Sequence, residues 1–304
     1  MISTTVQGIL AGFVPEEHIL IQEPLSRHTT FQVGGEADCV ILIETEEELS
    51  ALNRYLNQIG LPYFVLGNGS NLLVSDQGFH GIVLKTKGNF EKISTNGNKI
   101  TAQAGALLSQ IAKEACEQGL TGMEFAAGIP GTAGGAVIMN AGAYGGEMAQ
   151  VVEQVRLIGQ SGEVFTMTNA ALEFGYRKSA IKNLPFIVTE VTFALQKGEP
   201  EQIRAKMNEL AAARREKQPL QYPSAGSTFK RPEGYFAGKL IMDAGFRGYS
   251  LGGAQVSEKH CGFIINKGNA TAQDISDLIQ EVSEGVYEKF RVRLEPEVIR
   301  IGSF

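Results

Sequence analysis

Two glycine-rich segments are the parts of this sequence best suited to hold a ligand against the main chain. They are residues 67–72, with the sequence GNGSNL, and residues 128–145, with the sequence GIPGTAGGAVIMNAGAYG. Glycine admits positive φ and places no Cβ between a ligand and the backbone N–H groups. Successive N–H groups in such turns form nests for anions such as a pyrophosphate. Because the second segment is also small and neutral throughout, the two together predict a cradle for a large, flat cofactor.

The placement of glycine supports this interpretation, although each segment alone has a plainer one. Nine of the 36 glycines lie at 119–146 and seven more at 224–253, so the excess marks sites rather than general composition. Residues 67–72 follow an expected strand, but Leu72 stands where the Rossmann fingerprint has its last glycine, and no G-K-[ST] of a Walker A loop occurs. Taken alone, this segment fits a tight turn equally well. Residues 128–145 also fit a segment that is small for packing reasons.

The histidines and cysteines indicate neither a metal site nor a disulfide framework. His28 and His260 have no second ligand at a useful spacing, so we expect both to be structural. Cys39, Cys116 and Cys261 are odd in number and widely spaced, which fits neither a zinc knuckle nor paired disulfides. Unpaired cysteines of this kind fit a reducing cytoplasm.

Charge and hydropathy narrow the class of protein further. The net charge of −6 argues against a nucleic-acid partner. No apolar run reaches about 18 residues, so we expect no membrane insertion, and residues 1–13 lack the basic start and apolar block of a signal peptide. We therefore predict a cytoplasmic protein that binds any anionic small molecule through a local cluster of positive groups.

The elements that must position these segments predict an α+β fold. A strand at 38–43, a helix that begins after the N-cap Thr45 with Glu48 three residues on, and a strand at 62–66 give a β-α-β start. Regular repetition stops after residue 66, which argues against a plain Rossmann or TIM-barrel fold. Thr271 and Asp274 mark the start of a long final helix. We expect further helices at 107–118, 200–217, 236–244 and 271–290, and further strands at 72–74, 82–84, 90–93, 99–103, 151–158, 163–167, 186–195, 261–266 and 293–301.

Taken in order along the chain, the motifs resemble a known family. Residues 67–72 with 130–145 look like the FAD-binding domain of the vanillyl-alcohol-oxidase/PCMH type. Further motifs narrow the resemblance to the UDP-N-acetylenolpyruvoylglucosamine reductase (MurB) family, and they cover the chain from about 27 to 302. These motifs are His28-Thr29-Thr30-Phe31 with Gly34, Gly35, Ala37 and Asp38; Gly175-Tyr176-Arg177-Lys178-Ser179; Pro223-Ser224-Ala225-Gly226-Ser227-Thr228-Phe229-Lys230; His260 with Gly262-Phe263-Ile264 and Asn266; and Leu294-Glu295-Pro296-Glu297-Val298.

The resemblance implies a PCMH-type FAD-binding region of two α+β subdomains, followed by a C-terminal α+β substrate domain. We place the FAD-binding region at 1–200, with subdomains of about 1–86 and 87–200, and the substrate-binding domain at 201–304. The boundary follows the composition shift at 197–201 (KGEPE). Between Arg177 and Pro219 we expect one strand and one helix, which leave no room for an inserted substrate-capping loop. The chain therefore resembles the shorter, second type of the family.

The resemblance also implies an enzyme of peptidoglycan synthesis, a UDP-N-acetylmuramate dehydrogenase with non-covalent FAD and with NADPH as co-substrate. Its partner is a UDP-sugar, UDP-N-acetylglucosamine enolpyruvate, whose enolpyruvyl double bond is reduced to give UDP-N-acetylmuramate. Hydride addition leaves negative charge beside the substrate carboxylate. The reaction therefore needs a cation or a hydrogen-bond donor there and an acid that protonates carbon.

The same resemblance assigns these roles. Arg177 matches the family's carboxylate-gripping arginine, Ser227 its proton donor, and Glu297 the second glutamate of L-E-x-E-V. Glu297 is expected to position the substrate or water and to polarise the enol, with an acid role as the alternative. Lys230 is expected to bind substrate and to support Ser227. Local sequence alone makes Arg177 a surface salt-bridge arginine and Ser227 a turn serine. The cofactor-binding residues that the resemblance implies are Gly67, Asn68, Gly69, Ser70, Asn71, Leu72, Gly128, Ile129, Pro130, Gly131, Thr132, Gly134, Gly135, Asn140, Ala141 and Gly142.

The end of the chain leaves two assignments open. On a regular closing strand Glu295, Glu297 and Ile299 share one face, so Glu295 competes with Glu297 for the same role. Ile299 also stands where the family has a basic residue directly after E-V, which leaves a cofactor contact from Arg300 open.

Two other functions compete with the reductase. One is another PCMH-type FAD oxidoreductase that acts on a small hydroxy acid or alcohol, and the motifs of Ser227 and Glu297 argue against it. The other is a non-enzymatic nucleotide-binding protein that keeps the fold, against which the intact Arg177, Ser227 and Glu297 argue. No histidine or cysteine occurs in 130–145 to anchor a flavin covalently.

Overall fold

The structure, a computed structural model, describes residues 4–304. Residues 1–3 of the N-terminal segment considered above lie outside the described residues. The described residues form two compact units: unit 1 comprises residues 4–21, 39–68 and 81–214, and unit 2 comprises residues 22–38, 69–80 and 215–304. Within residues 4–304, none of the helices combines the length and the apolar character that a membrane span requires.

The first sheet has four strands in the order β1-β2-β5-β3. Strand β5 lies between β2 and β3, and it runs parallel to β3 with Ile82 opposite Tyr63. Helix α2 begins where predicted, because the Glu48 N–H donates to Thr45 Oγ1 at 3.1 Å, and it ends at Gly60, which has a φ of 66°. The elements here are α1 (Thr4–Leu10), β1 (Ile19–Pro24), β2 (Glu36–Ile43), α2 (Glu46–Ile59), β3 (Tyr63–Leu66) and β5 (Phe79–Thr86).

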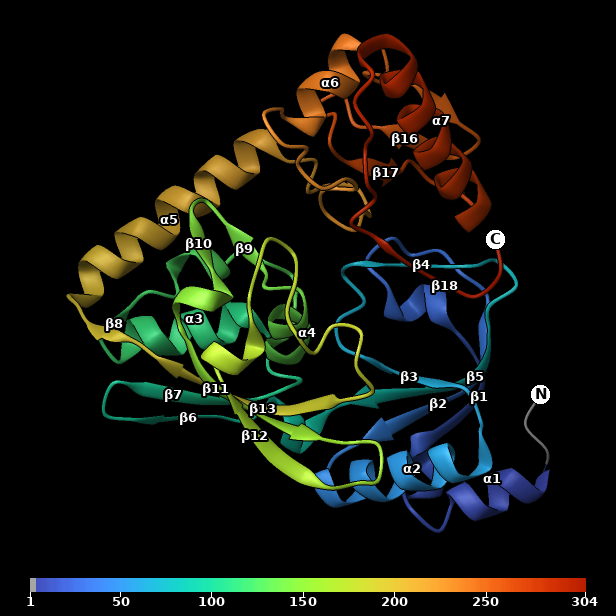
Figure 1. Ribbon diagram of the computed structural model, residues 1–304, viewed down its shortest axis with the longest axis vertical. Helices are drawn as coiled ribbons and strands as arrows, with labels where there is room; N and C mark the ends of the chain where they lie inside the picture. The colour runs from blue at the N-terminus through green and yellow to red at the C-terminus, as the bar shows by residue number, and fades with distance from the viewer. Residues whose placement is uncertain (1–3) are drawn as a thin grey trace. The chain divides into compact units, whose positions relative to one another are not determined.

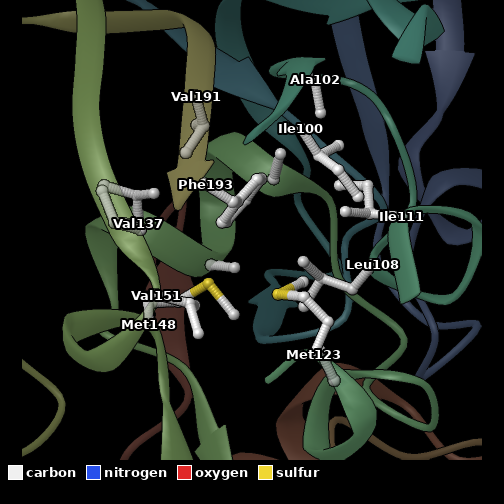
Figure 2. Close-up of a cluster of buried hydrophobic side chains, with 14 of the residues drawn as sticks. Ile100, Ala102, Leu108, Ile111, Met123, Val137, Met148, Val151, Val191 and Phe193 are labelled. Atoms are coloured by element: carbon white, nitrogen blue, oxygen red, sulfur yellow. The ribbon is translucent and has the colours of Figure 1, made fainter. Parts of the chain in front are cut away.

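The second sheet, in unit 1, has five antiparallel strands in the order β12-β11-β13-β7-β6. Helices α3 and α4 lie on one face of it (Figure 1). Figure 2 shows the core between them, where Ile100 and Phe193 of the strands meet Leu108 of α3 and Val137 of α4. Burying side chains of this size stabilises the fold by about 1.5–3 kcal/mol each, so the core fixes α4 and the glycine-rich segment that contains it. The elements are β6 (Ile93–Asn96), β7 (Lys99–Gln103), α3 (Leu108–Glu117), α4 (Ala133–Ile138), β11 (Val152–Ile158), β12 (Val164–Thr168) and β13 (Ile187–Ala194), with the short pairs β8 (Leu120–Thr121) and β14 (Gln196–Lys197), and β9 (Gly142–Ala143) and β10 (Gly146–Glu147).

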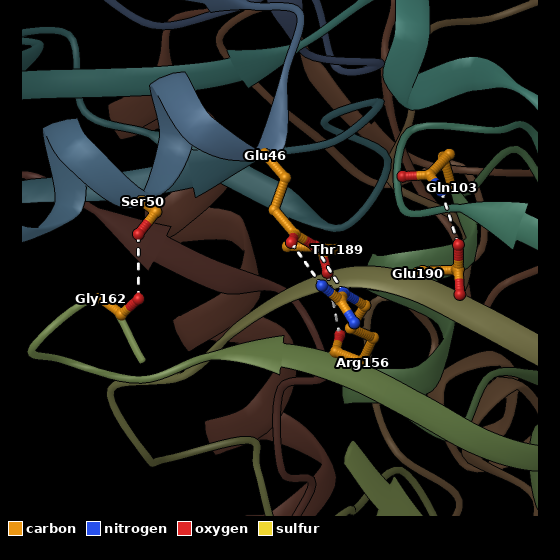
Figure 3. A network of polar contacts seen from close by, with 7 residues as sticks. All are labelled: Glu46, Ser50, Gln103, Arg156, Gly162, Thr189 and Glu190. Carbon is orange, nitrogen blue, oxygen red and sulfur yellow. Dashed lines mark hydrogen bonds and ion pairs between the residues drawn. The ribbon is translucent and has the colours of Figure 1, made fainter. Parts of the chain in front are cut away.

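Polar contacts fasten helix α2 to the second sheet (Figure 3). Arg156 of β11 makes a two-point ion pair with Glu46, with Nε to Oε2 at 2.9 Å and Nη2 to Oε1 at 2.8 Å. The Ser50 hydroxyl donates to the Gly162 carbonyl at 2.9 Å, in the turn between β11 and β12. Helix α2 also packs on the first sheet, so it ties the first and second sheets together.

In unit 2, helix α7 packs on the three-stranded sheet β15-β16-β17 (Figure 1). The predicted cap of α7 is confirmed, since Asp274 N–H donates to Thr271 Oγ1 at 2.9 Å. The first N–H groups of the helix, those of Ala272 and Gln273, donate to the Asp76 carboxylate at 2.8 and 2.9 Å. The elements are β4 (Leu72–Val74), α6 (Ala237–Asp243), β15 (Ser250–Leu251), β16 (Ala254–Val256), β17 (Ile264–Asn266), α7 (Ala272–Phe290) and β18 (Ile299–Ile301), which pairs in parallel with β4; α5 (Pro200–Lys217) precedes α6 and ends in this unit.

Several predicted elements differ from the structure. The strand predicted at 293–301 is confined to Ile299–Ile301, because the Glu295 carbonyl before it accepts the Lys230 N–H instead of extending β18. The segment predicted as a strand at 90–93 begins in a 3₁₀ turn and joins β6 only at Ile93. Helix α5 has the predicted bounds, but Ile203 is its one buried residue. The helix is therefore charged over most of its surface and has no continuous apolar face. Helices α1 and α4 and strand β1 were not predicted from the sequence.

Candidate active site

The two glycine-rich segments meet inside unit 1, where strand β3 ends and helix α4 begins. A Cβ at Gly67 would lie 2.5 Å from Thr132 Oγ1, so only glycine fits there. The Asn68 Nδ2 donates to the Pro130 carbonyl at 2.7 Å, across 62 positions of sequence. The structure therefore brings these parts of the predicted cradle together.

The residues of the second segment divide into accessible and buried positions. Gly128, Pro130 and Gly135 are exposed, whereas Thr132 and Gly134 are buried. The Gly134 N–H donates to the Ala104 carbonyl at 2.9 Å, and a Cβ there would lie 3.0 Å from the Ala104 Cβ. Gly134 is therefore small so that α4 can pack closely, while the exposed positions are accessible to a ligand.

A cation that the sequence analysis did not single out lies beside this cradle. Arg214 of α5 packs so closely on Gly128 that a Cβ there would lie 2.6 Å from its Nη1. Burial lowers the pKa of Arg214, but a guanidinium stays charged in proteins. Arg214 is the first of four consecutive charged residues on a surface helix, so its neighbours in the sequence do not distinguish it as a cofactor-binding residue. Small neutral residues beside a half-buried positive charge fit the flat ring and the anionic diphosphate of FAD.

The rest of the first segment belongs to unit 2, where it contacts the start and the end of the chain. Gly69 has a φ of 61°, and a Cβ there would clash with the His28 carbonyl oxygen. The Asn71 Nδ2 donates to the Glu297 carbonyl at 3.1 Å, and the Ile299 N–H donates to the Asn71 carbonyl at 3.0 Å. Asn71 therefore holds the chain segment that carries Glu297, a contact that glycine-loop patterns do not predict.

Arg177, in unit 1, occupies a tight turn at the rim of the second glycine-rich segment. Its φ is 54°, and its guanidinium Nη2 donates to the Gly142 carbonyl at 3.1 Å. The guanidinium carbon also lies 5.0 Å from the ring centroid of Tyr176. The side chain is half-buried. These contacts join Arg177 to the predicted cofactor segment and argue against a loose surface salt bridge.

Ser227 and Glu297 lie on paired segments of unit 2. The Glu297 N–H donates to the Thr228 carbonyl, and the Thr228 N–H donates to the Gly262 carbonyl, both at 2.8 Å. Phe229 and Pro296 form an antiparallel bridge, and the Lys230 N–H donates to the Glu295 carbonyl at 2.9 Å. Ser227 is exposed and Glu297 half-buried. Main-chain pairing thus places the two predicted residues next to one another in space.

The two glutamates that compete for one role, Glu295 and Glu297, have different partners. The Lys230 ammonium makes an ion pair with the Glu295 carboxylate, whose side chain is 69% exposed. Glu297 is half-buried and is held through its main chain by Thr228 and Asn71. Glu295 is therefore the surface ion-pair residue. Lys230 reaches Glu295, and the structure shows no contact from its ammonium to Ser227.

The remaining polar candidates have structural partners. His28 Nε2 lies 3.0 Å from Glu23 Oε1, and His260 Nδ1 accepts the Gly262 N–H at 3.1 Å. Burial lowers the pKa of His260, which favours this neutral form of the ring. Arg300 Nη2 donates to the Ser276 carbonyl of α7 at 3.5 Å.

Comparison with known proteins agrees with these observations. A family model described as an FAD binding domain matches residues 37–168, and the model of the UDP-N-acetylenolpyruvoylglucosamine reductase C-terminal domain matches residues 218–301. A relative named UDP-N-acetylenolpyruvoylglucosamine reductase, from Lachnoclostridium phytofermentans, is 52% identical over 297 residues, which is 96% of each chain.

Solved structures add the fold. The crystal structure of UDP-N-acetylenolpyruvylglucosamine reductase (MurB) from Thermus caldophilus aligns with a TM-score of 0.80 and 38% identity, over 93% of this chain and 98% of that one. An alkyldihydroxyacetonephosphate synthase aligns with a TM-score of 0.50 and 16% identity, over 65% of this chain and 41% of that one, and this likeness concerns the fold alone. The fold is the predicted α+β, PCMH-type FAD-binding fold, and the chain belongs to the UDP-N-acetylenolpyruvoylglucosamine reductase family.

Proposed function

We propose that this chain reduces the enolpyruvyl double bond of UDP-N-acetylglucosamine enolpyruvate to give UDP-N-acetylmuramate, with NADPH as reductant. Bound, non-covalent FAD supplies the hydride chemistry between the two. The residues at 67–72 and 128–142 would hold it, with Arg214 as the nearby positive charge. The observation that carries the proposal is the main-chain pairing of the Ser227 and Glu297 segments, at 2.8 Å between Glu297 N and the Thr228 carbonyl.

Arg177 is proposed to bind the substrate carboxylate. A guanidinium presents parallel N–H donors to a carboxylate, and it stabilises the charge that builds there after hydride addition. The contact of Nη2 with the Gly142 carbonyl and the positive φ restrict where the group points. A restricted guanidinium loses little freedom when it binds its anion.

Ser227 is proposed to protonate the carbon that bears the carboxylate. Its Oγ gives up one proton there and regains one from water, since the side chain is exposed. Glu297 positions the substrate beside it. The ion pair with Glu295 leaves Lys230 as a residue for substrate binding rather than as a partner of Ser227.

We also propose residues 1–200 as the FAD-binding region, with subdomains of about 1–86 and 87–200, and residues 201–304 as the substrate-binding domain. The start of α5 at Pro200 supports the boundary at 200. The compact units divide the chain differently, since unit 1 extends to Arg214 and unit 2 includes residues 22–38 and 69–80. The cytoplasm is the proposed location, since NADPH and UDP-sugars are cytoplasmic metabolites. The net charge of −6 supports small molecules, and not nucleic acid, as partners.

The test separates the two half-reactions of Ser227→Ala by stopped-flow spectroscopy. Bleaching of the flavin by NADPH should proceed at the wild-type rate, whereas its reoxidation by the enolpyruvyl substrate should slow by about 10²–10⁴-fold. Ser250→Ala, at an exposed serine of the same unit, is the matched control and should leave both steps unchanged. Equal slowing of both steps would show that Ser227 is not the proton donor. A purified protein that binds no FAD would refute the proposed reductase activity as a whole.

The alternative, an oxidase of the same fold for a small hydroxy acid or alcohol, predicts turnover of such a substrate with oxygen and without NADPH. The match of residues 218–301 to the reductase C-terminal domain, which spans Ser227 and Glu297, favours the reductase.

A further inference from the structure

Arg177 lies in a backbone conformation that needs support from outside its own turn. The Gly175 N–H donates to the Lys178 carbonyl and the Lys178 N–H to the Gly175 carbonyl, both at 3.0 Å, so Tyr176 and Arg177 form the tip of a tight turn. Arg177 has a φ of 54° there. A left-handed residue other than glycine costs energy and persists only where its surroundings fix it.

Helix α4 ends beside this turn, and Asn140 shapes its end. Asn140 has a φ of 41°, its N–H donates to the Val137 carbonyl at 3.1 Å, and the Ala141 N–H donates to the Ala136 carbonyl at 2.8 Å. This pair of hydrogen bonds is the Schellman motif, in which the left-handed position is usually glycine and sometimes asparagine. Asparagine and glycine therefore both satisfy the backbone at position 140.

The side chain of Asn140 does something that glycine cannot. It is 0% exposed, its Nδ2 donates to the Gly175 carbonyl at 2.9 Å, and its Oδ1 accepts the Ala149 N–H at 2.9 Å. A second bond runs the other way, since the buried Ser179 hydroxyl donates to the Ile138 carbonyl at 2.8 Å. The turn that carries Arg177 is thus clamped to the end of α4 on both sides of the arginine.

We propose that Asn140 is a positioning residue for Arg177: its amide fixes Gly175, and through it the turn that aims the guanidinium. The inference rests on the proposed role of Arg177 in binding the substrate carboxylate. It differs from the cofactor contact expected of Asn140 from the resemblance, because the buried amide is engaged by the main chain of unit 1. A displacement of about 1 Å in a group that binds the reacting part of a substrate costs about 10²-fold in rate.

Asn140→Asp is the sharpest test, because it changes one function of the side chain. Aspartate has the same size, tolerates the left-handed region and keeps an acceptor for the Ala149 N–H. It loses the donor to Gly175 while ionised and regains one, an O–H, when protonated. Burial raises the pKa of a carboxyl group, so protonation falls within an accessible pH range. Wild type and Asn140→Asp share the other charged residues of these segments, so the titration of those residues affects both proteins alike. They are Glu147, Arg177, Lys178 and Lys182.

We expect kcat/KM for the enolpyruvyl substrate to fall about 10–100-fold at alkaline pH in Asn140→Asp and to recover toward wild type as the pH falls. FAD content and the rate of flavin reduction by NADPH should match wild type throughout. Asn140→Gly keeps the left-handed backbone and removes the side chain, so it should show the same loss without the acid recovery. Ser179→Ala should weaken the substrate step in the same direction, and it covers the case in which Asn140→Asp does not fold.

Arg177→Lys separates this inference from the function on which it rests. If Arg177→Lys leaves the substrate step intact, the proposed role of Arg177 is wrong and the inference falls with it. If Arg177→Lys slows that step while Asn140→Gly and Ser179→Ala behave as wild type, the function stands and the positioning role is wrong. Loss of FAD, or equal slowing of both half-reactions, in the folded Asn140 variants would make Asn140 a cofactor-binding or purely structural residue.

Discussion

Thr228 allows a direct test of how unit 2 holds its candidate catalytic residues. Its side chain is 0% exposed, and its Oγ1 accepts the Ile264 N–H at 3.0 Å. The Thr228 carbonyl accepts the Glu297 N–H, and the Thr228 N–H donates to the Gly262 carbonyl. Ser227 immediately precedes Thr228 in the sequence. Thr228→Val keeps the shape of the side chain and removes the acceptor, so it leaves the Ile264 N–H buried without a partner.

The expected cost follows from that one lost bond. An unpaired buried N–H costs about 1–3 kcal/mol, so the free energy of unfolding should fall by about 2 kcal/mol. At about 2–4 °C per kcal/mol, this lowers Tm by about 4–8 °C. Thr228→Ser is the matched control, because it keeps the hydroxyl and loses one methyl group, at about 1 kcal/mol. Since Thr228 sets the position of Ser227, only the valine variant should also slow reoxidation of the flavin by substrate, by about 10-fold.

Thermal melts and stopped-flow half-reactions of the two variants decide the matter. The reasoning is refuted if Thr228→Val melts with the wild type, or if the serine variant slows the substrate step as much as the valine variant does. In the first case Ile264 finds another acceptor, and in the second the methyl packing and not the hydrogen bond holds Ser227.

Two further predictions concern the stability of each unit. Asp76→Ala removes the carboxylate that accepts from Ala272 and Gln273 at the start of α7, and it should cost about 1–2 kcal/mol in a thermal melt, with Asp76→Asn in between; a melt equal to wild type would show that the cap within α7 suffices. In unit 1, the hydrogen bond from Arg156 holds the pKa of Glu46 below its ordinary value of 4.5. A carboxyl group whose pKa is lowered by folding stabilises the folded protein at pH values above its unfolded-state pKa, and this stabilisation is lost as the pH falls through its folded-state pKa. Between neutral pH and about pH 3, the free energy of unfolding of wild type should therefore fall by up to about 1 kcal/mol more than that of Glu46→Gln. The difference is small because both partners of the ion pair are partly exposed. Parallel acid titrations of the two proteins would contradict this.

The elements that local sequence predicts well are those whose ends are defined by local contacts. Helices α2 and α7 begin at Thr45 and Thr271 because each threonine accepts an N–H three residues on. Helix α4 escapes such reasoning, since Gly134 and Gly135 lower its helix propensity and its stability comes from packing on Ala104 and the strands below it. The closing strand fails for the opposite reason: residues 294–298 have a strand pattern, but their main chain pairs with 228–230.

The candidate site divides in the same way. The residues proposed to act on substrate, Arg177, Ser227 and Glu297, are recognisable from motifs of a few residues. What positions them is not, because the contacts of Asn71 with Glu297 and of Thr228 with Ile264 span 226 and 36 positions. The cation Arg214 is hidden for a related reason, since only the fold shows that it meets Gly128.

The polar residues beside the proposed catalytic groups share one property. Asn140, Ser179 and Thr228 are each less than 4% exposed, and each directs its side-chain polar atoms at main-chain groups and not at solvent. A buried polar group without a partner would cost about 1–3 kcal/mol, and each of these residues avoids that cost by satisfying a main-chain group. Arg177 and Ser227 are accessible by comparison. The motifs G-Y-R-K-S and A-G-S-T-F-K therefore combine a group suited to meet the substrate with a buried neighbour that fixes the backbone beneath it, and this explains why short motifs can specify a precise geometry in a loop.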